Sequence, residues 1–369
     1  MASMASFFGS FFDKPTSVIG IDIGSSAIKV VQIKKKRGHA VLETYGELAL
    51  GPYAGTEIGR ATNLPVEKVI EAVKDILRES KTTTTSCGVA LPLSSSLITF
   101  MTIPPVSGKQ IAEVVALEAR KYIPVPLDEV MLDWSPIPRE ESFVTEDESS
   151  QTEKQGSDFL VVAIHNEYLS NYQQIMSGCG LHPSFYEIEI FSSIRVVVDH
   201  GVHTDMIIDV GARSTKLYIV ERGVLRASHI INKGSQDITL ALSKALSIPV
   251  AEAENMKTSY GLKGGPEYKE MKEIITVNLD YIFYEANSAI LTYQKKYAKN
   301  VSKVILTGGG VLLKGFLDLA KISFQTEIVY ADPFGKLETP AFLADEFAKA
   351  GPEFAVAIGI ALRRLSELE

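Results

Sequence analysis

One sequence pattern occurs twice in this chain and limits how the chain can fold. An apolar run leads into an aspartate, a glycine, small and hydroxyl residues, and then an alternating stretch that contains a lysine. The first copy is VIGIDIGSSAIKVVQIKKK, beginning at Val18, and the second is MIIDVGARSTKLYIVERG, beginning at Met206. Alternating β-branched residues around a short turn are typical of a β-hairpin. The sequence therefore predicts two similar half-domains, each built on a hairpin with an aspartate at the end of its first strand.

Hydrophobic periodicity predicts the elements around these two hairpins. In the first half, strands are expected over 18–24, 27–35, 40–50, 86–92, 94–105, 130–138, 158–166 and 182–189, and helices over 64–80, 108–123, 167–180 and 190–201. In the second half, three strands are expected within 205–231, then helices over 234–246, 249–261 and 266–300, a strand, glycine turn and helix over 301–321, and a closing helix over 351–369. This alternation predicts an α/β fold. So long a repeat indicates a duplicated half-domain, because solenoid repeats span about 20–50 residues.

Three local features lie at the borders of these elements. Ser107 is the expected N-cap of the helix over 108–123. The segment 139–157 is mostly acidic and has no periodicity, so a flexible loop is expected, with a phosphorylation switch as the alternative. Near the start, FFGSFF predicts a short tail that docks on its own domain or frays, with contact to a membrane or a partner as the alternative.

Length, charge and cysteine content narrow the class of protein. A chain of 369 residues is too long for one simple core, so two lobes or several subdomains are expected. The formal net charge of -8 argues against general nucleic-acid binding. Cys87 and Cys179 are isolated, which favours a reducing cytosol over a disulfide, zinc or iron–sulfur framework. The apolar runs are shorter than the ~20 residues of a membrane span, and the start lacks the pattern of a signal peptide.

Each hairpin has the chemistry of a phosphate clamp. Gly24 permits a tight turn, the N–H groups and hydroxyls of Ser25 and Ser26 can donate to phosphate oxygens, and Lys29 adds a cation. Asp22 could hold the water shell of Mg²⁺. The second hairpin repeats this chemistry from Gly211 to Thr215, and the stretch TGGGVLLKGF adds three glycines between a strand and a helix. Any one of the three could be an ordinary tight turn, but the ordered set on a duplicated framework predicts a nucleotide site.

The three motifs IDIGSSAIKVVQI, IIDVGARSTKLYIV and ILTGGGVLLKGF resemble the two phosphate motifs and the adenosine motif of the actin-like ATPase superfamily. The stretches ARKYIPVPLDEV and ITLALSKALSIPVAEAENMK resemble the FtsA/PilM family within it, and are closer to PilM than to FtsA. The resemblance covers nearly the whole chain. It implies an actin-like ATPase fold of two duplicated ribonuclease-H-like lobes with an extra subdomain, called 1C. It divides the chain into subdomain 1A (1–86 and 166–204), 1C (87–165), 2A (205–233 and 300–369) and a helix-rich 2B (234–299).

The resemblance also implies roles for individual residues, with ATP or ADP and Mg²⁺ as cofactors. Asp22 and Asp209 would lie near Mg²⁺, and Glu189 would orient the attacking water. The phosphates would contact Gly24, Ser25, Ser26 and Lys29 from one side and Gly211, Ala212, Ser214 and Thr215 from the other. The α-phosphate, sugar and base would contact Gly308, Gly309, Gly310, Glu254 and Lys257. The alternatives are solvated strand charges for Lys29 and Lys216 and a surface ion pair for Glu254 and Lys257.

Two positions depart from the pattern of the superfamily. Relatives often have a glycine pair where this chain has Gly234–Ser235, a candidate phosphate or sugar contact. Actin has a histidine beside the water where this chain has Lys216. In-line attack needs a positioned water as well as neutralised charge, so the expected activity is at most a weak ATPase, with nucleotide acting mainly as a structural ligand.

The resemblance implies a cytoplasmic scaffold of type IV pilus, secretion or competence assembly on the inner-membrane face. It would capture the N-terminal tail of a PilN-like bitopic membrane protein and meet the membrane only indirectly. It also admits pilus motor ATPases as partners and self-assembly. Candidate groove residues for the tail are Arg120, Tyr122, Ile123 and Pro124, with a helix end packed on its own core as the alternative.

Two other functions stay open on sequence grounds. A sugar or acid kinase shares the phosphate motifs, but no substrate motif accompanies them, and two isolated cysteines exclude the zinc cluster of the glucokinase type. An FtsA-like division protein would end in a linker and an amphipathic membrane helix, whereas this sequence stops at SELE after a packed helix. The scaffold is therefore the preferred expectation.

Overall fold

The computed structural model describes residues 17–106, 110–138, 156–199, 201–264 and 269–368. It divides into two compact units, the first comprising Met1–Leu91 and Met176–Glu369 and the second Pro92–Ile175. The FFGSFF segment, Ser107 and nearly all of the acidic segment lie outside the described residues.

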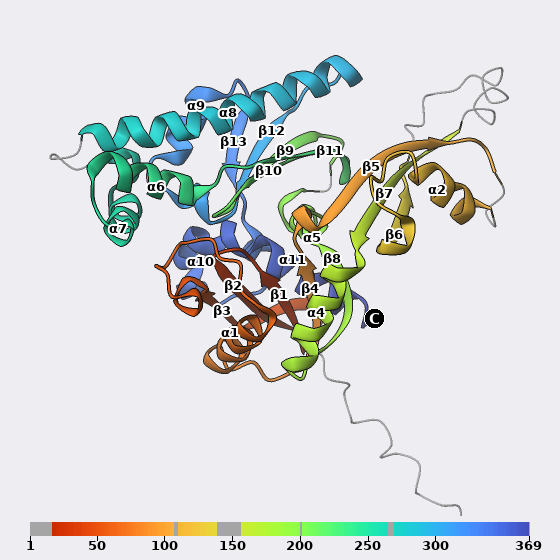
Figure 1. Cartoon of the computed structure of the whole chain (residues 1–369), viewed down its shortest axis with the longest axis horizontal. Helices are drawn as coiled ribbons and strands as arrows, with labels where there is room; N and C mark the ends of the chain where they lie inside the picture. The colour runs from red at the N-terminus through yellow and green to blue at the C-terminus, as the bar shows by residue number, and fades with distance from the viewer. Residues whose placement is uncertain (1–16, 107–109, 139–155, 200, 265–268, 369) are drawn as a thin grey trace, which may run out of the picture. The chain divides into compact units, whose positions relative to one another are not determined.

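The first sheet of unit 1 carries the first hairpin. It contains β1 (Ser17–Ile23), β2 (Ala27–Lys36), β3 (His39–Ala49), β4 (Ser86–Leu91) and β8 (His182–Ile188), in the order β3-β2-β1-β4-β8. Helices α1 (Val66–Glu79), α5 (Glu189–Val197) and α11 (Ala355–Ser366) pack against this sheet, and α11 contacts β1, β2, β4 and α5. The chain therefore returns at its end to cover the sheet with which it begins (Figure 1).

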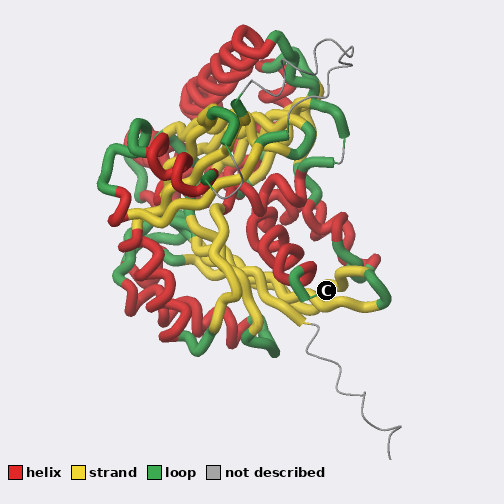
Figure 2. The backbone as a smooth tube through the Cα atoms, turned by 90° about the vertical axis from the view of Figure 1, so that its right-hand side faces the viewer, coloured by secondary structure: helices red, strands yellow, loops and turns green. Residues whose placement is uncertain are grey.

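The second sheet repeats the first. It contains β9 (Thr204–Val210), β10 (Thr215–Glu221), β11 (Val224–Ile231), β12 (Lys303–Thr307) and β13 (Glu327–Tyr330), in the order β11-β10-β9-β12-β13. In both sheets the first three strands pair antiparallel and the remaining pairs are parallel. Helices α6 (Ser235–Leu246), α7 (Val250–Tyr260), α8 (Lys269–Tyr297), α9 (Phe316–Ser323) and α10 (Ala344–Ala350) follow in this half. Figure 2 shows both sheets in yellow with red helices beside them, and the expected duplication is confirmed.

The local sequence explains most of these elements. In α1, Val69, Ala72, Val73 and Ile76 are buried, which is the spacing of one helix face. Strand β9 is buried along its whole length because it lies in the middle of its sheet. Both faces of β9 are buried, so its sequence TDMIIDV does not need to alternate between apolar and polar residues.

Unit 2 is a smaller three-stranded sheet with helices. Strands β5 (Ser96–Ile103), β7 (Ser157–His165) and β6 (Val130–Pro136) lie in that order and pair antiparallel. Helix α2 (Ile111–Ala119) packs against β5, and α4 (Asn166–Gly178) begins in this unit. The core contains Met101, Ile103, Val115, Ala119, Ile123, Val130, Phe159, Val161 and Ala163.

Several sequence predictions need correction. The proposed boundary at residue 87 falls inside β4, which pairs with β1 and so belongs to the first sheet. The glycine triplet does not open α9 directly, because a 3₁₀ helix at Gly309–Leu312 comes between them. A separate 3₁₀ turn, Gly351–Phe354, precedes α11, since Pro352 cannot continue a helix from within. The short elements β13 and α10 were not predicted, since neither is long enough to show a period.

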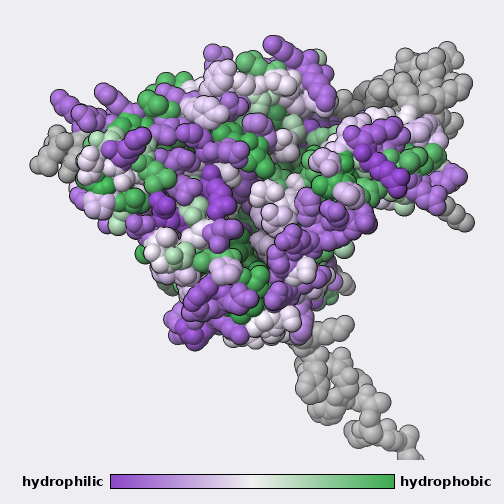
Figure 3. Space-filling model, in the orientation of Figure 1, coloured by the Kyte–Doolittle hydropathy of each residue, from purple (hydrophilic) through white to green (hydrophobic). Residues whose placement is uncertain are grey.

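The surface of the molecule is mixed in polarity. On the face drawn in Figure 3, apolar residues lie in small groups among hydrophilic ones. No helix in the described part of the chain combines the length and the apolar character needed to cross a membrane.

Candidate nucleotide site

The two hairpins of unit 1 have the same geometry. Asp22 at the end of β1 lies directly opposite Lys29 on β2, and Asp209 at the end of β9 lies directly opposite Lys216 on β10. Each turn is closed by a glycine N–H that donates to a carbonyl three residues on, at 3.0 Å in both cases. In both copies the turn therefore sets one carboxylate directly opposite one ammonium group on the neighbouring strand. Directly opposite residues of an antiparallel pair point to the same face of the sheet, so the two side chains are neighbours.

Lys216 joins the carboxylates of the second hairpin. Its Nζ lies 2.6 Å from Glu189 Oε2 and 3.2 Å from Asp209 Oδ2. Tyr218 is fully buried and donates its hydroxyl to the same Asp209 oxygen at 3.2 Å. Burial lowers the pKa of Lys216, but the two carboxylates outweigh it and raise that pKa well above its usual value. Lys216 is therefore a permanently charged ion-pair partner and not a solvated strand charge.

The surroundings of Asp22 favour its protonated form. Burial raises the pKa of Asp22 to about 7, with further increases from the Glu189 and Asp209 carboxylates, against which Lys29 and Lys216 act. A cation bound nearby would favour the charged form of this carboxyl group and lower its pKa. The acidic residues of both hairpins and of α5 thus share one electrostatic environment.

These residues fit a hydrated Mg²⁺ and not a fully protein-bound metal. No group of three or more His, Cys, Asp or Glu residues in the described ranges is arranged to hold a metal ion. Mg²⁺ keeps several waters and commonly binds through one or two carboxylates plus phosphate oxygens. The raised pKa of Asp22 is the observation that favours such an ion beside Asp22 and Asp209.

Lys29 has its own acidic partners. Its Nζ lies 2.9 Å from Glu47 Oε1 and 3.8 Å from Glu353 Oε2. Burial lowers the pKa of Lys29, but Glu47 and then Glu353 outweigh it, so the net pKa is raised. Sequence reasoning missed Glu353, whose only signal is a charged residue just before an apolar helix. A Cβ on Gly309 would lie 3.4 Å from Glu353 Oε2, so this carboxylate links the first hairpin to the glycine triplet.

The glycine triplet packs closely on β9. Gly308 has φ +86, and a Cβ there would lie 2.4 Å from Asp209 Oδ1. A Cβ on Gly310 would lie 2.4 Å from Val210 Cγ1. Packing within the protein therefore requires glycine at positions 308 and 310, as in an ordinary tight turn. A side chain at Gly309 would have more room than one at either neighbour.

The start of α6 is bonded to the second hairpin. Ser235 N–H donates to the Gly211 carbonyl at 2.9 Å and Gln236 N–H to the Ala212 carbonyl at 3.0 Å. A Cβ on Gly234 would lie 2.4 Å from Ala212 O, so only glycine fits there. The fully buried Thr215 donates its hydroxyl to Lys233 O at 2.9 Å. Gly234 and Thr215 thus serve the hairpin itself, whereas Ser214 at the turn is only partly buried.

Glu254 and Lys257 are not a surface pair. Lys257 Nζ lies 2.8 Å from Glu254 Oε2 and 2.9 Å from Thr239 Oγ1, and burial lowers the pKa of Lys257. Gly59, with φ +86, lies so close that a Cβ there would be 2.8 Å from Glu254 Cδ. The surface-pair alternative is wrong, and the loop Gly59–Thr62 lies against this cluster.

The same loop joins both hairpins. Thr62 N–H donates to Ser25 O at 2.8 Å, and Arg213 donates to Thr62 O at 2.7 Å. Ala61 N–H donates to Gln236 Oε1 at 3.1 Å. The first turn is therefore tied, through this loop, to residues of the second half.

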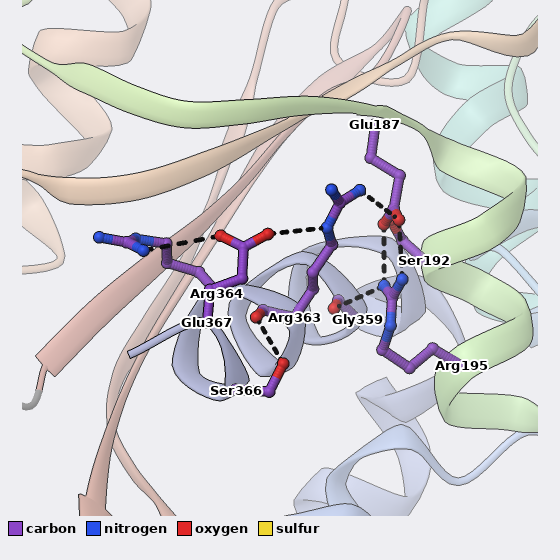
Figure 4. A network of polar contacts seen from close by, with 8 residues as sticks. All are labelled: Glu187, Ser192, Arg195, Gly359, Arg363, Arg364, Ser366 and Glu367. Carbon is purple, nitrogen blue, oxygen red and sulfur yellow. Dashed lines mark hydrogen bonds and ion pairs between the residues drawn. The ribbon is translucent and has the colours of Figure 1, made fainter. Parts of the chain in front are cut away.

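The position of α5, which carries Glu189, depends on a polar network around the buried Glu187 carboxylate. Figure 4 shows the guanidinium groups of Arg195 and Arg363 pointing at the Glu187 carboxylate, at 2.8 Å each. Ser192 donates to Glu187 at 2.6 Å and Arg195 also donates to Gly359 O at 3.0 Å. Burial raises the pKa of Glu187, but Arg195 and the other donors outweigh it and lower the pKa. The network fastens α5 to β8 and α11.

The candidate groove residues lie in unit 2. A pocket of about 400 Å³ is lined by Arg120, Val125, Pro126, Leu127 and Asp128. Tyr122 is 49% exposed, and Pro124 is exposed as well. Ile123 is in the core of the unit, so for this residue the core-packing alternative describes the structure.

With the geometry in place, comparison with known proteins identifies the family. The sequence model of the family described as type IV pilus assembly protein PilM matches residues 20–365. The chain belongs to this family. Among solved structures, a PilM–PilN type IV pilus biogenesis complex contains a chain with TM-score 0.79 and 23% identity, covering 94% of this chain and 98% of that one.

More distant relatives extend the likeness. The cell division protein FtsA of Neisseria meningitidis serogroup B is 23% identical over 383 residues, covering 92% of this chain and 88% of FtsA. MreB5 of Spiroplasma citri, solved with AMPPNP, has TM-score 0.52 at 12% identity, covering 96% of this chain and 98% of MreB5. This member of the PilM family therefore has the actin-like ATPase fold expected from its sequence.

Proposed function

We propose that the chain is an ATP-binding scaffold of type IV pilus assembly, or of a related secretion or competence machine. The observation that carries this proposal is the matched pair of hairpins, each with an aspartate opposite a lysine beside a glycine turn. The AMPPNP-bound structure of MreB5 supports nucleotide binding by this fold. ATP or ADP with Mg²⁺ would tie the two halves of unit 1 together.

Each half would supply one side of the phosphate clamp. Asp22 and Asp209 would face a hydrated Mg²⁺, whose charge offsets the carboxylates that raise the pKa of Asp22. The phosphates would meet the turn of Gly24 to Ser26 with Lys29 on one side, and Gly211 to Ser214 on the other. When bound, Mg²⁺ supplies charge neutralisation for the phosphate groups.

Hydrolysis is expected to be slow or absent. In-line attack needs a water oriented by a nearby group. Glu189 is the candidate for that role, but its Oε2 accepts from Lys216 Nζ at 2.6 Å. A carboxylate held by an ammonium group is a poorer hydrogen-bond acceptor for water, so nucleotide would be held longer than it is turned over.

The clamp is tested by calorimetric titration with AMPPNP and Mg²⁺. Asp22→Ala and Asp209→Ala should each abolish measurable binding while the far-UV circular dichroism is unchanged. Asp199→Ala is the control, because its side chain is 78% exposed and pairs with Lys336. Wild-type affinity in both site variants would overturn the clamp.

The partner in this proposal is the cytosolic N-terminal tail of a PilN-like inner-membrane protein. Support comes from the likeness to the chain of the PilM–PilN complex and from the pocket of unit 2 beside Arg120. Tyr122 follows the pocket residue Arg120 by two positions, and its exposed ring offers an apolar contact that an extended tail could cover. The scaffold would then lie on the cytosolic membrane face through its partner and not by a lipid contact of its own.

Two tyrosines of unit 2 provide a matched test of the tail site. A synthetic peptide of the tail should bind wild type, and Tyr122→Ala should weaken binding by about tenfold, as expected for an aromatic interface residue. Tyr168→Ala is the control, since Tyr168 is similarly exposed at 47%. Equal losses in the two variants, or none, would count against this site.

The remaining parts of the proposal concern organisation. We retain the four-subdomain division with its first boundary moved to the end of β4, and we include self-assembly and contact with pilus motor ATPases as further interactions.

The FtsA relative makes a role in cell division the second candidate function. Pelleting of the pure protein with lipid vesicles, without any partner, would favour that role over the scaffold.

A further inference from the structure

The second sheet ends in an uncovered strand. Strand β11 is the last strand of the order β11-β10-β9-β12-β13, and within the described ranges its only strand partner is β10. An edge strand presents N–H and C=O groups that can pair with another chain. Proteins normally cover or interrupt such an edge, so an open one is a place to look for a partner.

The first sheet shows how the corresponding edge is covered. Strand β3 occupies the equivalent place there, and the chain segment at Glu338 runs along it as a short parallel bridge to Val41. Leu42 N–H donates to Glu338 O at 3.0 Å, and Glu338 N–H donates to Ala40 O at 2.8 Å. One copy of the duplicated hairpin thus already accepts an extended segment on its outer edge.

The two edges are alike in detail. The β2–β3 turn and the β10–β11 turn each contain an Arg–Gly pair with positive φ, at Arg37–Gly38 and Arg222–Gly223. Both outer strands carry a bulge, where Glu43 and Arg226 are the unpaired extra residues of the register. The Glu338 segment lies directly before the bulge of β3. In the described part of the chain, no added segment pairs with the corresponding residues before the β11 bulge, 223–225.

A groove lies on the other side of this bulge and includes the bulge residue Arg226. Four consecutive β11 residues, Arg226, Ala227, Ser228 and His229, line a groove of about 360 Å³ together with Glu285, Ser288, Ala289, Thr292, Tyr293, Lys296 and Tyr297 of α8. Successive side chains of a strand point to opposite faces, so consecutive residues can line one groove only along the strand's edge. Helix α8 forms the other wall.

The lining of the groove contains apolar residues and charged residues of both signs. Ala289 and the ring of Tyr293 belong to the apolar part, and Tyr293 is buried in the core beneath. Lys296 is exposed with its Nζ 4.9 Å from the Tyr297 ring centre. His229 Nε2 lies 3.6 Å from Glu285 Oε2, a contact that joins β11 to α8. A chain of net charge -8 thus offers a local cation beside an open strand edge.

We propose that the groove between β11 and α8 binds an extended peptide segment of a partner protein as an added strand. The segment would pair its backbone with β11, place a small apolar side chain against Ala289 and Tyr293, and place an acidic side chain near Lys296. This site is separate from the nucleotide clamp and from the pocket of unit 2 that Arg120 lines. Its occupant is a separate protein and not a second copy of this chain.

Two threonines of α8 give a matched test. Thr292 lines the groove and Thr276 does not, yet each donates its hydroxyl to the carbonyl four residues earlier at 2.8 Å. A displayed library of random peptides of about twelve residues is selected on the full chain, and the selected peptides are measured by fluorescence polarisation. Thr292→Trp should weaken binding by about tenfold or more, whereas Thr276→Trp should leave it unchanged.

Two further readouts define the mode of binding. Lys296→Glu should remove the preference for acidic peptides, and amide exchange at 226–229 should slow in the complex. Failure to select any binder, or equal binding by both tryptophan variants, would overturn the proposal. Sedimentation showing a dimer of the chain that Thr292→Trp dissociates would also overturn it, because the occupant would then be a second copy.

Discussion

At the scale of single residues, the two similar motifs have different electrostatic surroundings. Lys216 forms ion pairs with Glu189 and Asp209, whereas Lys29 forms ion pairs with Glu47 and Glu353. Burial, and then the acidic neighbours of Asp22, raise the pKa of Asp22 to about 7 against the effect of Lys29 and Lys216. The charge of Asp22 therefore changes near neutral pH.

This raised pKa predicts a pH dependence of stability. The folded protein binds the Asp22 proton more tightly than the unfolded chain, whose aspartate pKa is about 3.8, so the contribution to stability is full below about pH 4 and lost as pH rises to about 7. Each pKa unit corresponds to about 1.4 kcal/mol. In urea unfolding without nucleotide, Asp22→Asn should therefore gain stability relative to wild type as pH rises from 4 to 7. Parallel curves would contradict the assignment.

At the scale of elements, α11 is held unusually close to its neighbours. A Cβ on Gly359 would lie 2.1 Å from Ser192 O of α5, and one on Gly20 of β1 would lie 1.9 Å from Ala357 O of α11. Small residues thus let α11 touch both the sheet and α5. The network of Glu187 with Arg195 and Arg363 fastens the same contact through hydrogen bonds.

A methyl group at this crossing should therefore disturb the site from a distance. Gly359→Ala forces α5 away from α11, and α5 begins with Glu189. We expect a loss of about 1–3 kcal/mol in the free energy of unfolding and weaker AMPPNP binding by calorimetry. Ser366→Ala, at the exposed end of α11, is the control and should change neither. Unchanged nucleotide affinity in Gly359→Ala would contradict the expectation that the contact between α5 and α11 affects the nucleotide site.

At the scale of the whole of unit 1, several connections join the halves, among them the Lys216–Glu189 ion pair. The loop Gly59–Thr62 bonds both to Ser25 and to residues of the second half, Arg213 and Gln236. Glu353 and the Pro352 carbonyl, which accepts from Gly308 N–H at 2.9 Å, connect the glycine triplet to Lys29 and α11. A nucleotide between the hairpins would add a further connection.

Nucleotide should therefore stabilise the chain as one cooperative body. A ligand at about one hundred times its Kd adds about 2.7 kcal/mol, which corresponds to a rise of a few degrees in Tm for a chain of this size. Calorimetric scans with Mg²⁺ and AMPPNP should show this rise in wild type and not in Asp209→Ala. A shift of the same size in the variant would mean that the nucleotide binds elsewhere.

The sequence by itself determined what depends on neighbours in the chain. Alternation and turn residues predicted both hairpins, and the turn length then set Asp22 opposite Lys29 and Asp209 opposite Lys216. The glycine motifs and the order of strands and helices predicted the duplicated fold. These features follow from period and turn chemistry, which act over a few residues.

The tertiary structure decided what depends on residues distant in the chain. It brought Glu353 to Lys29 and Glu189 to Lys216, raised the pKa of Asp22, and buried Ile123, which sequence reasoning had placed in the groove. It also left β11 open where β3 is covered by Glu338. Burial and ion pairing arise only when separate elements pack, so a local pattern can name the charged residues but not the partners that set their charge.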